Sequence, residues 1–134
     1  GKAWIHSGGQ TTDQYTLWEH CAEQDTFLEA MADAASTVTK HFAGKIAYVA
    51  VMKNLSVDCD CCAVAEDPCM NDVGILSSLD PVALDRACID LVRNSNDPGR
   101  DHFMERVNSR HGTHTIDAAE ALGIGTQDYE LVRV

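Results

Sequence analysis

The sequence predicts an α/β fold, a single compact domain in which a short mixed or parallel sheet is covered by helices. Apolar residues recur at helical spacing in several segments, and two short apolar runs are typical of buried strands. The chain has 134 residues, of which 45% are hydrophobic and 23% are charged, a composition typical of a globular protein. We therefore expect one domain over residues 1–134.

The first part of the chain contains one clear helix and one clear strand. Residues 1–23 are expected to be irregular, apart from a short helical turn near Trp18. Apolar residues three or four positions apart predict a helix over residues 24–42, which Gly44 ends. The apolar run over residues 45–52 predicts a strand buried on both faces, as in a parallel or mixed sheet.

A loop, a second strand and another helix follow. Residues 54–72 are expected to form the loop and residues 73–76 the strand. Asp80 and Pro81 then predict a helix start, because aspartate caps the first amides and proline suits the first helical position. The apolar face of this helix consists of Leu84, Ala87, Cys88, Leu91 and Val92.

Two further helices and an edge strand complete the predicted fold. The Asp-Pro-Gly sequence of residues 97–99 breaks the chain, and a helix is expected from there to Gly112. A short helix over residues 116–122 ends at Gly123, where glycine suits the position after a helix. Residues 129–132 are expected to form a closing edge strand.

The charge of the chain excludes two classes of partner. Acidic residues outnumber basic ones, 21 to 10, which gives a net charge of −11. Because nucleic acids and anionic lipids attract lysine and arginine, we expect neither nucleic acid nor membrane as a partner. No apolar run approaches the roughly 18 residues of a membrane span, and no signal peptide begins the chain. A cytoplasmic protein is therefore expected.

The clearest chemical signal is a cluster of cysteines in the predicted loop. Four of the six cysteines, Cys59, Cys61, Cys62 and Cys69, lie within eleven residues. Such crowding argues against a disulfide scaffold and indicates a metal or redox site, because thiolates bind zinc, copper(I) and iron–sulfur clusters. The spacing C-x-C-C-x6-C is neither that of bacterial ferredoxins nor that of a zinc ribbon, so it indicates a metal without selecting one.

Other interpretations of these thiols stay open. They could pair as disulfides, stay reduced and inert, act as a nucleophile or redox group, or belong to a site that another chain completes. The acidic residues around them attract cations and raise thiol pKa values. These residues are Asp58, Asp60, Glu66 and Asp67.

Several residues outside the loop are weaker candidates. His6 could be a ligand if the N-terminal segment folds over the loop, and Cys21 is a second reserve. His111 and His114 have an H-x2-H spacing that permits metal binding, although a histidine at a helix end is also favoured by the helix dipole. Since the sequence has no Walker, G-x-S-x-G or H-E-x-x-H motif, it does not establish that the protein is an enzyme.

Five segments share a pattern with known proteins. Two of them are NLSVDCDCC (54–62) and DVGILSSLDPVALD (72–85), and the others are residues 1–7, 111–114 and 121–125. Together they resemble the "Fe–S center protein" group of the family named domain of unknown function 362. The resemblance implies that the chain is the C-terminal portion of a longer protein. It also implies that some members carry a separate ferredoxin-like cluster motif, which this sequence lacks.

These observations lead to one preferred function and two alternatives. We expect a metal-binding or iron–sulfur protein with a role in redox chemistry or electron transfer, whose ligands are the four loop cysteines. The expected cofactor is an iron–sulfur cluster or zinc, and the expected partners are the N-terminal part of the parent protein and a redox partner. The alternatives are a structural zinc-binding domain and a non-catalytic interaction domain of a larger protein.

Overall fold

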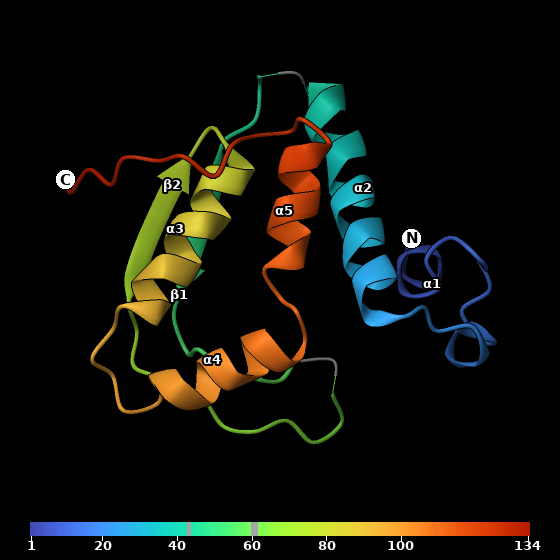
Figure 1. The fold of residues 1–134 in the computed structure, drawn as a ribbon, viewed down its shortest axis with the longest axis horizontal. Helices are drawn as coiled ribbons and strands as arrows, with labels where there is room; N and C mark the ends of the chain where they lie inside the picture. The colour runs from blue at the N-terminus through green and yellow to red at the C-terminus, as the bar shows by residue number, and fades with distance from the viewer. Residues whose placement is uncertain (43, 60–61) are drawn as a thin grey trace.

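Five α-helices and a two-stranded sheet make up the part of the chain that the computed structural model describes, residues 1–42, 44–59 and 62–134 (Figure 1). The helices are α1 (Lys2–His6), α2 (Gln24–Phe42), α3 (Pro81–Arg93), α4 (Arg100–Ser109) and α5 (His114–Ala121), and a 3-10 turn, η1, spans Leu17–Glu19. The strands are β1 (Tyr48–Met52) and β2 (Gly74–Ser78). None of the helices in this part of the chain has the length and apolar character needed to cross a membrane.

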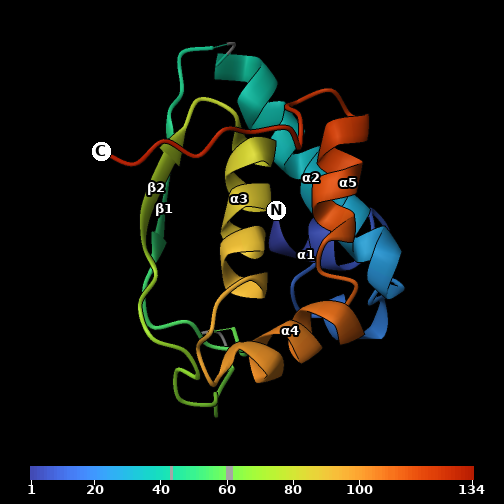
Figure 2. The ribbon, with the colours of Figure 1, turned by 60° about the vertical axis from the view of Figure 1, so that its left-hand side comes forward.

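The elements are arranged in layers. Figure 2 shows the sheet with α3 against one face, and α2 and α5 on the far side of α3. Helix α5 packs along α2, and α1 packs on the N-terminal part of the same helix. Helix α4 lies at the end of the molecule where the chain passes from β1 to β2 (Figure 1). This arrangement places the cysteine loop beside α4.

The α/β class is confirmed, but the predicted direction of strand pairing is wrong. β1 and β2 are antiparallel, with Tyr48 opposite Ser78 and Met52 opposite Gly74. The described residues between them, 53–59 and 62–73, contain no helix, whereas the crossover between parallel strands is usually helical. β1 is therefore not buried on both faces: α3 covers one face, while the exposed fractions of Val49 and Ile75 on the other face are 63% and 71%.

Helix α2 has the predicted bounds, but its buried face differs from its most apolar stripe. Leu28, Ala32 and Ser36, which follow one another at intervals of four, are buried. The apolar residues Met31 and Val38, which helped to predict the helix, are exposed. Small side chains let α5 pack closely on α2, and this contact decides which stripe faces inward.

The start of α3 is also as predicted. Asp80 accepts hydrogen bonds from the amides of Val82 (2.9 Å) and Ala83 (3.0 Å), and Pro81 occupies the first helical position. Helices α4 and α5 begin and end within a few residues of the predicted bounds.

Two predictions about the ends of the chain are wrong. The N-terminal segment, expected to be irregular, contains α1 as well as the helical turn η1. Residues 129–132 form no strand; no strand follows β2 in the described chain. The hydroxyl of Tyr129 instead donates a hydrogen bond to Asp90 Oδ2 at 3.1 Å, so this segment is held by side-chain contacts to α3 and not by a strand ladder.

Two clusters of buried residues lie in the core of the described part of the chain, one on each side of α3. The first joins α2, α3 and α5 through Ala32, Val82, Ile116 and Ala119. The second joins β1, the β1–β2 loop, α3 and α4 through Met52, Met70, Val92 and Met104. The second cluster therefore lies directly beneath the cysteine loop and supports its base.

Candidate functional site

The base of the cysteine loop is a short continuation of the β1–β2 hairpin. Leu55 and Met70 form an isolated antiparallel bridge, and the amide of Cys69 donates to the carbonyl of Leu55 at 2.8 Å. Between this bridge and the two strands, the amide of Asn54 donates to Asp72 Oδ1 at 3.0 Å. These bonds bring the two ends of the loop together, so the cysteines are presented on a closed loop and not on a free chain.

Two of the candidate ligands share one turn. The amide of Cys62 donates to the carbonyl of Cys59 at 3.0 Å, and both residues are exposed. Cys59 and Cys62 have C-x2-C spacing, which is typical of metal sites with thiolate ligands. In the full pattern C-x-C-C-x6-C this spacing is easily missed, because Cys61 lies between the two residues. Cys61 falls between them and lies outside the residues that the structure describes.

Cys69 has a different environment. It is half-buried at the base of the loop and packs against the core cluster that contains Met52 and Met70. Cys88 on α3 packs against the same cluster, as the apolar face of its helix predicted. Burial, together with the nearby carboxylate of Asp85, raises the pKa of the Cys88 thiol, so this residue stays a protonated packing group at neutral pH.

Helix α4 holds the loop through an arginine. Arg106 Nη1 donates to the carbonyl of Val57 at 3.0 Å and to Asp58 Oδ1 at 2.7 Å. The second carboxylate oxygen of Asp58 accepts the amide of Glu66 at 3.0 Å. This amide, reinforced by Arg106, holds the pKa of Asp58 below its ordinary value. The Asp58 carboxylate thus closes the segment that contains the Cys59–Cys62 turn.

A histidine of α4 makes a second contact with the loop. His102 Nε2 lies 2.8 Å from Glu66 Oε2, and the hydroxyl of Ser56 donates to the carbonyl of Glu66 at 3.1 Å. Neither Arg106 nor His102 was predicted from the sequence to be part of this site. The available signal was that an acidic loop is followed along the chain by a helix that carries an arginine and a histidine, side chains that can bind carboxylates.

The reserve candidates lie in the N-terminal segment, which packs on α2 and not over the cysteine loop (Figure 1). The ring of His6 stacks on Phe27 with centroids 4.8 Å apart and meets the edge of Trp18 at 6.0 Å. The thiol of Cys21 donates to the carbonyl of Leu17 at 3.8 Å. Within the described ranges, no three histidine, cysteine or acidic side chains converge in a geometry that could hold a metal ion.

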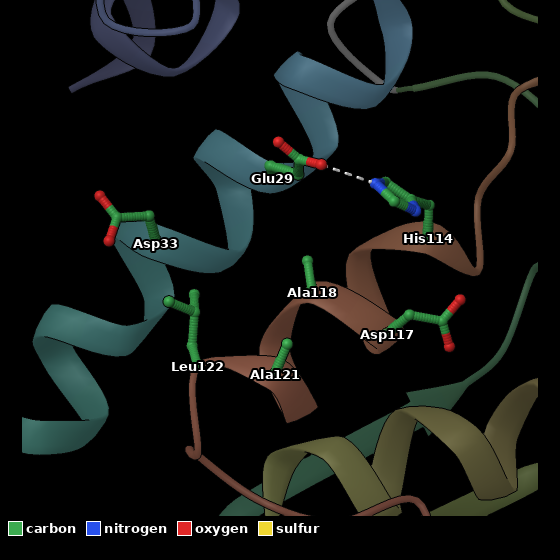
Figure 3. A pocket seen from close by; sticks show the side chains of 7 residues that line it. All are labelled: Glu29, Asp33, His114, Asp117, Ala118, Ala121 and Leu122. Atoms are coloured by element: carbon green, nitrogen blue, oxygen red, sulfur yellow. Dashed lines mark hydrogen bonds and ion pairs between the residues drawn. The ribbon is translucent and has the colours of Figure 1, made fainter.

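The H-x2-H histidines form a separate cluster where α5 begins. His111 Nδ1 lies 2.7 Å from Asp25 Oδ1. Figure 3 shows the second pair, in which His114 Nε2 lies 3.0 Å from Glu29 Oε1. The two carboxylates are one helical turn apart on α2, so the two histidines are placed to meet them in register. The pairs tie the start of α5 to α2.

An open groove of about 610 Å³ lies beside the His114–Glu29 pair. Its floor is apolar, formed by Ala118, Ala121 and Leu122. In Figure 3 the carboxylates of Asp33 and Asp117 point away from each other at opposite sides of the groove. The groove therefore lacks the convergent polar groups that orient a small ligand.

The His114–Glu29 pair makes a testable contribution to the pH dependence of stability. The hydrogen bond to Glu29 raises the pKa of His114, with further contributions from Asp25 and Asp117. A raised folded-state pKa stabilises the protein at pH values below the unfolded-state pKa of histidine, and this contribution is lost as the pH rises through the folded-state pKa. We expect Glu29→Gln to lower the pKa of His114 in an NMR titration.

The matched control is Asp33→Asn, because the carboxylate of Asp33 lies on the same helix but points away from His114 (Figure 3). It is expected to change the pKa of His114 less than Glu29→Gln does. An equal shift in both variants would mean that the general negative charge of α2, and not the Glu29 hydrogen bond, sets this pKa.

The cysteine loop lies within a region of the chain that matches a known protein family. A family model described as "Domain of unknown function (DUF362)" matches residues 1–90. The matched region contains both strands, the whole cysteine loop and most of α3, whereas α4 and α5 follow it. Neither the curated proteins nor the solved structures include a significant match to the chain.

Proposed function

The chain belongs to the DUF362 family, and from this premise we propose that its cysteine loop binds a thiophilic metal, as an iron–sulfur cluster or as zinc. The observation that carries the proposal is the turn in which Cys59 and Cys62 stand exposed at C-x2-C spacing. Resemblance of the chain to the "Fe–S center protein" group favours the iron–sulfur form, which would give the protein a role in electron transfer.

The donor set fits a soft metal in part. Cys59 and Cys62 supply two thiols from one turn, and Cys61 and Cys69 are the remaining candidates in the same loop. Cys69 would join them only by leaving its packing against the core, so we propose that the 59–62 turn binds first. A bound cluster would supply one-electron chemistry, and the protein would tune it through hydrogen bonds and burial. Reduced thiols of this kind suit the cytoplasm.

The form of the metal can be identified from one sample. An absorption spectrum of anaerobically purified protein would be recorded together with elemental analysis. Iron with a broad band near about 400 nm supports an iron–sulfur cluster, whereas a colourless sample with zinc supports the structural site. A folded, colourless protein that contains neither metal, and that takes up neither when it is supplied, contradicts the proposal.

The ligand assignment predicts a loss of metal on mutation. The double variant Cys59→Ser, Cys62→Ser is expected to lose the bound metal, because it removes both thiols of the turn. The control is Cys21→Ser, whose exposed thiol lies in the N-terminal segment packed on α2. We expect this control to keep the metal content of the unmodified protein. Full metal stoichiometry in the double variant would show that these cysteines are not the ligands.

A second candidate function, an interaction domain, is favoured by the outer face of the sheet. Val49, Val51 and Ile75 form an apolar surface on this face and are exposed. If interaction were the whole function and the cysteines were incidental, changing all four loop cysteines to serine would leave folding unaffected. The metal-binding proposal instead predicts that, with metal supplied, the quadruple variant has a lower thermal stability than the unmodified protein.

A further inference from the structure

We infer that Arg106 is a positioning residue for the metal-binding turn, an inference that rests on the metal-binding function proposed above. Arg106 belongs to α4, which lies beyond the region matched by the family model. Its contacts in the loop include Val57 and Asp58, the residues that precede Cys59, so it acts on the backbone that leads into the candidate ligands.

The contacts of Arg106 are concentrated at the entry to the turn. One guanidinium nitrogen donates both to the carbonyl of Val57 and to the carboxylate of Asp58, the two residues that precede Cys59. The backbone direction at this point is therefore set by a helix that is itself anchored in the core through Met104. The position of Cys59 follows from that direction.

The same contact also affects the end of the segment that follows the turn. With one oxygen on Arg106, the Asp58 carboxylate is oriented so that its second oxygen accepts the amide of Glu66, eight residues along the chain. The segment between these two residues contains the Cys59–Cys62 turn. Arg106 thus acts through Asp58 on both ends of the segment, which reduces the ordering that metal binding would otherwise require.

The chemistry of arginine suits this task. The Arg106 and Asp58 side chains are only 33% and 19% exposed, so their charge-assisted hydrogen bond is partly shielded from water. The guanidinium also neutralises a carboxylate that directly precedes the thiol ligands, which would otherwise add to the negative charge of the bound site. The neighbouring His102–Glu66 pair is about half exposed on both sides, and we assign it a lesser role.

The test is a titration of the reduced, metal-free protein with Co²⁺, followed by the absorption bands of cobalt–thiolate coordination. Arg106→Met keeps an unbranched apolar side chain in place of the methylene part of arginine but removes both hydrogen bonds. We expect it to weaken Co²⁺ binding by about 10- to 100-fold, the usual effect of removing a residue that orients a metal ligand. Arg106→Lys keeps the charge without the planar donor group and is expected to restore only part of the affinity.

The control is Arg93→Met, because Arg93 pairs with Asp90 on α3 and makes no hydrogen bond to the loop among those described. Unchanged Co²⁺ affinity is expected. Circular dichroism and thermal unfolding without metal separate a loss of affinity from a loss of fold. If Arg106→Met does not fold, Asp58→Asn replaces it; its amide keeps one acceptor oxygen but cannot accept a hydrogen bond through its nitrogen.

The outcomes separate this inference from the function on which it rests. Equal Co²⁺ affinity in the unmodified protein and in folded Arg106→Met overturns the role of Arg106 and leaves metal binding intact. If the unmodified protein gives no cobalt–thiolate bands, the proposed function fails and the inference fails with it. The inference is supported if Arg106→Met binds Co²⁺ more weakly, Arg106→Lys recovers part of the affinity, and Arg93→Met keeps the affinity of the unmodified protein.

Discussion

Replacing Gly99 with alanine is expected to lower the free energy of unfolding by about 3 kcal/mol, at the upper end of the usual cost of overpacking. A Cβ atom on Gly99 would overlap the carbonyl of Cys69 and would lie 3.1 Å from Met70 Cγ. The overlapping group is backbone, which cannot swing aside as a flexible side chain could. The loop would have to move away from α4, or α4 from the loop.

The effect is steric and does not come from the backbone conformation of Gly99. Its φ and ψ of −82° and −8° are accessible to alanine. The matched control is Gly112→Ala, where the nearest atom, the carbonyl oxygen of Val107, would be 3.3 Å from the new Cβ. Chemical denaturation of both variants measures the difference, and a loss of less than about 1 kcal/mol in Gly99→Ala would contradict the observed packing.

The same variant also tests the site. Gly99 lies against the base of the loop, and its own amide donates to Asp97 Oδ1 at 2.8 Å, which fixes the turn before α4. Because Cys69 is carried by the displaced backbone, metal binding is expected to weaken together with stability. A variant that lost stability but bound Co²⁺ with full affinity would show that Cys69 is not needed for binding.

Replacing Asp80 with alanine is expected to lower the free energy of unfolding by about 2 kcal/mol, because helix caps contribute up to roughly that amount. Asp80 Oδ1 accepts the amides of Val82 and Ala83 at the start of α3, and Oδ2 accepts the amide of Thr126 at 2.9 Å. One carboxylate therefore caps α3 and anchors the C-terminal segment. Gly125 packs so closely on this carboxylate that any side chain at that position would overlap it.

Asp80→Asn separates the two roles of this carboxylate. The asparagine side chain keeps one acceptor oxygen, which can still cap α3, but its amide nitrogen cannot accept from Thr126. We expect Asp80→Asn to retain more than half of the stability lost in Asp80→Ala. Equal losses in urea denaturation would place the contribution in the C-terminal contact and not in the helix cap.

The parts of the fold that the sequence predicted correctly depend on local interactions. Helix α2 was predicted with the correct bounds because its apolar spacing lies within one helix, and the start of α3 because Asp80 bonds to amides two and three positions away. The direction of strand pairing was not predicted correctly, because it depends on how the chain returns after the loop. The buried face of α2 depended on its contact with α5.

The candidate site divides in the same way. The cysteine-rich loop between two strands follows from the sequence, since residue types and their spacing are enough to locate it. Its attachment to α4 does not, because Arg106 meets Asp58 across 48 positions of the chain. The sequence of this protein thus determines where helices begin and where thiols gather, through contacts within a few residues. The tertiary structure alone decides which distant side chains bind the loop that carries those thiols, because packing between elements selects partners that no local pattern encodes.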